Sequence, residues 1–68
     1  MRIDRIKLIA EMARQDLTVK VLAEMSGVSR ITISSIRRGK SCSKLVGNAI
    51  AAALNMDIED ILENEKED

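Results

Sequence analysis

Residues 27–40 of the chain, GVSRITISSIRRGK, gather the side chains best suited to contacting a polyanion. Arg37, Arg38 and Lys40 lie close together, and no acidic residue occurs between Glu24 and Asp57. Arginine and lysine bind phosphate oxygens through charge-assisted hydrogen bonds, and serine and threonine add small donors and acceptors. The stretch is poor in strong helix formers, so a requirement other than helix stability must favour its short side chains.

The chain offers no comparable set of catalytic or metal-binding residues. It has no histidine and a single cysteine, Cys42, so neither an intrachain disulfide nor a zinc site can be assembled. Cys42 has no resolving partner and is expected to be a packed thiol rather than a redox sensor. Glu59 and Asp60 resemble an acid pair, but helix capping and the helix dipole explain them better. We therefore expect no enzyme activity, no cofactor and no metal.

The charges of the chain sum to zero but are unevenly distributed. Residues 1–44 contain ten Lys and Arg against four Asp and Glu, whereas residues 45–68 contain one Lys against seven acids. A domain polarised in this way attracts polyanions at one end and repels them at the other. A merely solvated charged surface is the alternative that composition leaves open.

Length and composition restrict the class of protein further. The 68 residues suffice for one small domain, and the absence of Phe, Tyr and Trp requires an aliphatic core. Arg2, Asp4 and Arg5 make the first segment too charged for a signal peptide or a membrane span. We therefore expect a cytoplasmic protein without membrane contact.

The spacing of apolar residues predicts an all-α fold, a compact bundle of five helices. The first helix, over about residues 2–14, is expected to bury Ile6, Ile9, Ala10 and Ala13. The fourth is expected to bury pairs that recur every four residues, Leu45/Val46, Ala49/Ile50 and Ala53/Leu54. A fifth, after a capping box formed by Asp57 and Asp60, is expected to carry Ile58, Ile61 and Leu62.

Residues that cap helices mark the ends of the second, third and fourth of these helices. Thr18, Ser29 and Ser43 precede the apolar spacings and are suited to accept hydrogen bonds from the first turn. Gly27 and Gly39 follow the second and third helices, where glycine tolerates the positive φ of a helix end.

The third helix, residues 29–38, has two different faces when its residues are placed 100° apart. Ile33 and Ile36 lie on one side, which predicts contact with the core. The opposite side mixes an isoleucine with hydroxyls and cations: Arg30, Ile31, Ser34, Ser35 and Arg38. The major groove of duplex DNA is roughly 12 Å wide and admits one helix, and short side chains bring the backbone near the base edges.

The residue types on this face match the chemistry of base pairs and phosphates. Arginine binds guanine O6 and N7 with two donors, serine bonds several bases, and an apolar side chain touches the thymine methyl. Arg30, Ile31 and Ser35 therefore form a candidate base-reading set, although a protein partner is the alternative for Ile31. The cations at the helix end are better placed for phosphates, which position a protein without specifying sequence: Arg37, Arg38 and Lys40.

The segment LTVKVLAEMSGVSRITISSIRRGK resembles the helix-turn-helix signature of the Cro/C1-type (XRE) phage-repressor family. The shared pattern is Leu-Thr, Leu-Ala, Gly-Val-Ser and a closing Gly-Lys. The resemblance implies a five-helix, lambda-repressor-like DNA-binding domain over residues 1–62, with the helix-turn-helix at helices 2 and 3, and an acidic tail at 63–68. By position, Arg30, Ile31 and Ser35 match base-reading sites of the family, with Ser34 nearby, and Arg38 and Lys40 match its phosphate sites. We also expect Thr32 to bind phosphate.

Three departures from the family pattern concern the ends of the motif. Val19 replaces a common phosphate-contacting Gln, Val21 replaces a capping-box Glu, and Arg37-Arg38 replaces a common Glu-Asn. The last change makes this end more basic than usual.

The resemblance implies a transcriptional regulator, by expectation a repressor, that binds double-stranded DNA at a palindromic operator as a homodimer. We expect the dimer contacts in the C-terminal half, where Met56, Ile58 and Leu62 would form an apolar patch. The alternative is an antitoxin-like or adaptor module that uses the same fold to bind another protein.

Overall fold

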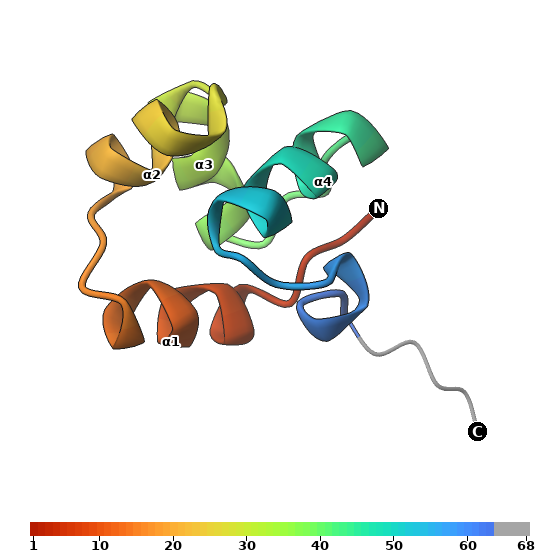
Figure 1. The fold of residues 1–68 in the computed structure, drawn as a ribbon. Helices are drawn as coiled ribbons and strands as arrows, with labels where there is room; N and C mark the ends of the chain where they lie inside the picture. The colour runs from red at the N-terminus through yellow and green to blue at the C-terminus, as the bar shows by residue number, and fades with distance from the viewer. Residues whose placement is uncertain (64–68) are drawn as a thin grey trace.

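The computed structural model describes residues 1–63, which form α-helices joined by short turns (Figure 1). The elements are α1 (Arg5–Arg14), α2 (Val19–Ser26), α3 (Arg30–Arg37), α4 (Lys44–Ala53) and a 3-10 turn, η1 (Ile58–Asp60). The predicted all-α fold is confirmed, but these residues contain four α-helices rather than five. None of the helices in this part of the chain is both long and apolar enough to cross a bilayer. The predicted acidic tail, apart from Glu63, lies outside the described residues.

The predicted capping residues hold the ends of the helices. Three hydroxyls each accept a hydrogen bond of 3.1 Å from the backbone N–H three residues further on: those of Thr18, Ser29 and Ser43. Gly27 ends α2 with a φ of 76°, in the left-handed region that glycine enters without a steric penalty. The local signals for these ends are confirmed.

Helix α1 begins later than predicted because Asp4 caps it. The Asp4 carboxylate accepts hydrogen bonds from the N–H groups of Ile6 at 2.9 Å and Lys7 at 3.2 Å. The residues before Asp4 are extended and run beside the C-terminal turn, as Figure 1 shows, with a bridge between Ile3 and Leu62. The N-terminal segment is therefore part of the folded domain.

The same pairing explains why the predicted fifth helix is wrong. The C=O of Ile61 accepts a hydrogen bond of 2.7 Å from the N–H of Asp4, and the N–H of Glu63 donates one of 2.9 Å to the C=O of Arg2. These groups bond across the chain instead of along a helix, and the predicted Asp57 cap makes no side-chain hydrogen bond. Only the turn η1 remains helical.

The core is aliphatic, as predicted, and the largest fully buried side chains among residues 1–63 are Leu8, Leu22, Ile33, Ile36, Ile50, Leu54 and Ile61. The predicted buried face of α1 is wrong, because Leu8 and Met12 fill the core while Ile6 is 61% exposed. Ala10 and Ala13 are also exposed, and Ile9 is half-buried. Leu45, predicted as a core residue of α4, is 81% exposed. Both helices thus leave apolar side chains in solvent.

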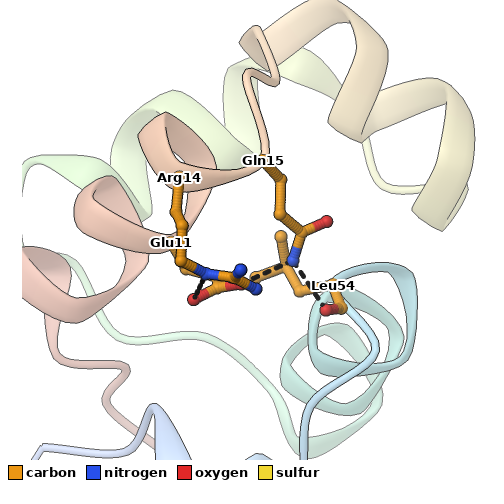
Figure 2. A network of polar contacts seen from close by, with 4 residues as sticks. All are labelled: Glu11, Arg14, Gln15 and Leu54. Carbon is orange, nitrogen blue, oxygen red and sulfur yellow. Dashed lines mark hydrogen bonds and ion pairs between the residues drawn. The ribbon is translucent and has the colours of Figure 1, made fainter.

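A polar network ties the end of α1 to the end of α4 (Figure 2). Gln15 donates hydrogen bonds through Nε2 to the Glu11 carboxylate at 2.6 Å and to the C=O of Leu54 at 2.9 Å. Arg14 pairs with the same carboxylate, whose side chain is 15% exposed. The hydrogen bonds from Arg14 and Gln15 lower the pKa of Glu11, and Glu11 in turn raises the pKa of Arg14.

This network predicts an acid-dependent contribution to stability. Because the pKa of Glu11 is lowered in the folded state, its contribution is complete above the ordinary glutamate pKa of about 4.3 and is lost as the pH falls through the lower value. Glu11→Gln should therefore destabilise the chain at pH 7, and the difference from the natural chain should shrink toward pH 3. Urea unfolding at several pH values measures the difference. Glu24→Gln, at an exposed carboxylate, is the control, and a Glu11→Gln difference that did not change with pH would contradict the prediction.

Candidate nucleic-acid interface

The turn between α2 and α3 holds the two helices in a fixed relation. Ser26 donates a hydrogen bond through Oγ to the C=O of Leu22 at 2.8 Å and accepts one from the N–H of Val28 at 3.2 Å. Val28 is buried, and Ile33 and Ile36 of α3 are fully buried in the same core. The predicted core face of α3 is thus confirmed, and the opposite face of α3 points to solvent.

The solvent face of α3 and the first turn of α2 enclose one open hollow, here called the α2–α3 hollow. Its lining residues are Thr18, Val19, Lys20, Arg30, Ile31, Ser34, Ser35 and Arg38. All four residues predicted to read bases are among them. Residues that were expected to act together from sequence therefore share one surface.

The side chains of the α2–α3 hollow differ in exposure. Arg30 and Arg38 are exposed and Ile31 is 80% exposed, whereas Ser34 and Ser35 are half-buried at the floor. The lining contains three cations and no acid. The N-terminus of α2 adds the positive end of its helix dipole. The hollow is suited to a partner that carries both negative charge and polar edges.

The two-helix unit identified by this geometry is a helix-turn-helix, and residues 7–67 match the Cro/C1-type HTH DNA-binding domain. The chain belongs to this family. No curated protein and no solved structure matches the chain itself. The α2–α3 hollow is thus the outer surface of a Cro/C1-type helix-turn-helix, and the chain is a DNA-binding domain.

Three residues predicted to contact phosphates lie outside the α2–α3 hollow of this Cro/C1-type domain. Thr32 accepts a hydrogen bond of 3.0 Å from the hydroxyl of Ser29, so its side chain is engaged at the start of α3. Arg37 is half-buried, and its buried Nε has no hydrogen-bond partner among residues 1–63. Lys40 is exposed beyond Gly39. Of the predicted phosphate-binding residues, Arg38 alone borders the hollow.

The first turn of α2 supplies lining residues that the sequence reasoning missed. Thr18 was predicted only as a cap, and Lys20 was assigned no role. Lys20 and Arg30 also line a neighbouring hollow together with Glu24. The helical period places Lys20 on the same side of α2 as Ala23, and both line this neighbouring hollow with Arg30, so the spacing could have identified Lys20.

Cys42, between α3 and α4, takes no part in this surface. The thiol is half-buried, and burial raises its pKa. Reactive cysteines have lowered pKa values, so the shift at Cys42 runs opposite to the one that activates a thiol.

Proposed function

We propose that this Cro/C1-type domain is a sequence-specific transcriptional regulator that places α3 in the major groove of duplex DNA. The observation that carries the proposal is that Arg30, Ile31, Ser34 and Ser35 line one acid-free hollow together with Arg38 and Lys20. The major groove is roughly 12 Å wide and admits the diameter of one helix, and the eight residues of α3 form two turns that can lie in it.

In this proposal the residues divide into two roles. Arg30 reads guanine through O6 and N7, Ile31 contacts a thymine methyl, and the two serines bond neighbouring base edges. The remaining residues position the domain on phosphates: Thr32, Arg37, Arg38 and Lys40, with Lys20 added from α2. The engaged hydroxyl of Thr32 makes it the weakest member of this set.

We further propose that the regulator represses transcription as a homodimer at a palindromic operator. A single module covers only about 600–1,000 Å² of protein surface, so two copies on half-sites about one DNA turn apart raise both affinity and selectivity. Occupancy of an operator that overlaps a promoter suffices for repression.

Selection from random duplex DNA at fixed, near-physiological salt tests the proposal. A recovered palindrome with a guanine at a fixed position in each half-site is the expected result. Weak, salt-sensitive binding without any motif would overturn it. That outcome would favour an adaptor or antitoxin-like module, for which the exposed Ile31 would supply a protein contact.

The role of Arg38 predicts a change in salt dependence. Arg38→Ala should weaken binding to all DNA sequences alike and flatten the slope of log affinity against log salt by about 0.9, the value for one phosphate contact. Fluorescence anisotropy titrations between low and physiological salt measure the slope. Lys7→Ala is the control, because it removes an exposed cation on α1, outside the α2–α3 hollow. It should leave the salt slope unchanged. An altered base preference in Arg38→Ala would contradict the assignment.

A further inference from the structure

Helix α1 lies against α3 (Figure 1), and a second hollow opens between them, here called the α1–α3 hollow. Its lining residues are Ile9 of α1 and Ser34, Arg37 and Arg38 of α3. They comprise one apolar side chain, one hydroxyl and two guanidiniums, and no acid is among them. Ser34 and Arg38 also line the α2–α3 hollow, so the two hollows adjoin along α3.

Arg37 has an unsatisfied donor at this hollow. Its side chain is half-buried, and the buried Nε has no hydrogen-bond partner among residues 1–63. A buried donor without a partner costs free energy, and most such groups in folded proteins bond to protein, water or a bound ion. A guanidinium bonds most strongly to carboxylate or phosphate oxygens. No carboxylate of residues 1–63 lines the hollow, so an oxyanion from a bound molecule is the fitting partner.

Two more arginines gather at this end of α3. Arg2 donates a hydrogen bond through Nη2 to the C=O of Gly39 at 2.8 Å, and its Nε pairs with the Glu63 carboxylate at 2.9 Å. Arg5 precedes Ile9 by one turn of α1, and its Cδ would lie 3.9 Å from a Cβ at Gly39. Arg5 is exposed and has no ion pair within residues 1–63. Glu63 thus compensates Arg2, and the charge of Arg5 stays open.

The dipole of α3 accounts for only part of this positive charge. A helix C-terminus carries about half an elementary negative charge, which a single cation can offset. Arg5, Arg37 and Arg38 together carry three positive charges, and Arg37-Arg38 stands where the family pattern commonly has Glu-Asn. The surplus is therefore free to attract a negatively charged partner, and it is a feature of this chain rather than of the pattern.

We propose that the α1–α3 hollow is a second phosphate site, in which Arg37 and Arg5 hold one phosphate of the DNA backbone. The proposal rests on the proposed function and extends it, because it brings α1 into the interface. With α3 in the major groove, the sugar–phosphate backbone flanks the helix, and this hollow adjoins the α2–α3 hollow. Arg37 supplies the buried Nε–H, Arg5 adds charge, and the apolar side chain of Ile9 limits access of water, which strengthens the bonds.

The hollow at the end of α4 has the opposite character. Its lining includes two acids, Asp57 and Asp60, and no cation. Phosphate is repelled there, in contrast to the α1–α3 hollow. Met56 and Ile58, which were expected to form an apolar patch at this end, pack against the core instead.

Anisotropy titrations with duplex DNA at several salt concentrations test the proposal. Arg5→Ala and Arg37→Ala should each weaken binding to all sequences alike, and the double variant should flatten the slope of log affinity against log salt by about 0.9, the value for one phosphate contact. Lys7→Ala is the matched control, an exposed cation of α1 that does not line the hollow, and should change neither affinity nor slope. Arg5 is exposed, so its variant should keep the fold, which circular dichroism checks.

Neutral methylphosphonates placed one at a time along both strands of the bound duplex identify the phosphate. The natural chain should lose affinity at several positions. The variant Arg5→Ala/Arg37→Ala should become insensitive at one of them and stay sensitive at the others, including the position at which Arg38→Ala is insensitive. A double variant as sensitive as the natural chain at every position would overturn the proposal.

The NMR resonance of the Arg37 Nε–H reports on the hollow directly. It should shift when duplex DNA is added, whereas the Nε–H of Arg2, bonded to Glu63, should stay in place. Inorganic phosphate alone is the second arm, and a saturable shift at low millimolar phosphate would assign the hollow to a free phosphate compound and overturn the assignment to DNA. If the natural chain binds DNA but Arg5→Ala and Arg37→Ala keep its affinity and salt slope, the second site is wrong and the proposed function stands. A natural chain that does not bind DNA would overturn both.

Discussion

Ile33→Ala is expected to lower the free energy of unfolding by about 2–5 kcal/mol, the usual cost of emptying a fully buried aliphatic site. Ile33 has no exposed surface and anchors α3 on the core. A domain of 68 residues has a total stability of about 3–10 kcal/mol, so this single substitution would remove a large share of that stability. Urea unfolding followed by helical circular dichroism measures the loss.

Ile31→Ala is the matched control for this experiment. It changes the same residue type in the same helix, but Ile31 is 80% exposed. Its unfolding free energy should stay within about 0.5 kcal/mol of the natural value, as for most surface substitutions. Equal losses from the two substitutions would contradict the assignment of the two faces of α3.

The contrast between these isoleucines also shows why the faces of α3 are predictable from sequence. Ile33 and Ile36 form its one apolar side, because the other side carries Arg30 and Arg38 with two serines between them. The helix has no second arrangement that buries a comparable apolar area. The cap of α3 is also a local signal, because Ser29 accepts a hydrogen bond from the first turn of the same helix. The position, the ends and the buried face of α3 were therefore predictable from the sequence.

Helix α1 offers two apolar stripes, and the choice between them is not local. Ile6, Ala10 and Ala13 follow a helical period as well as Leu8 and Met12 do. Which stripe is buried depends on how the other helices pack against α1, and Leu8 and Met12 are the side chains of α1 that lie in the shared core. The prediction that Leu45 is buried is wrong for the same reason. The buried side of α4 is centred on Gly47, Ile50 and Leu54.

The C-terminal turn and the α2 side of the site depend on contacts between distant residues. Residues 58–62 have a helical pattern, but hydrogen bonds from Asp4 and to Arg2 hold the segment in another conformation. Lys20 enters the candidate site only because α2 crosses α3 at the turn of Gly27. Local spacing predicts which residues of α3 share one face. It does not predict that Lys20 of α2 lies beside them, because that depends on how α2 crosses α3.

Arg30→Ala is expected to weaken binding to the selected operator by about 1–3 kcal/mol, or roughly 5- to 150-fold. Arg30 lies at the first position of α3, exposed, at the edge of the α2–α3 hollow. In the proposed function its guanidinium makes two hydrogen bonds to one guanine. The loss should appear as a relaxed preference at that base pair, with little change at the others. Repeating the random-DNA selection with the variant measures this preference position by position.

Arg30→Lys separates base reading from simple charge. Lysine keeps the positive charge but lacks the planar fork that bonds guanine O6 and N7 together. This variant should therefore bind unrelated DNA as the natural chain does, with the same salt slope, while its guanine preference falls most of the way to that of Arg30→Ala. If Arg30→Lys kept the full preference, Arg30 would act through its charge alone. The specificity of α3 would then have to come from Ile31 and the two serines.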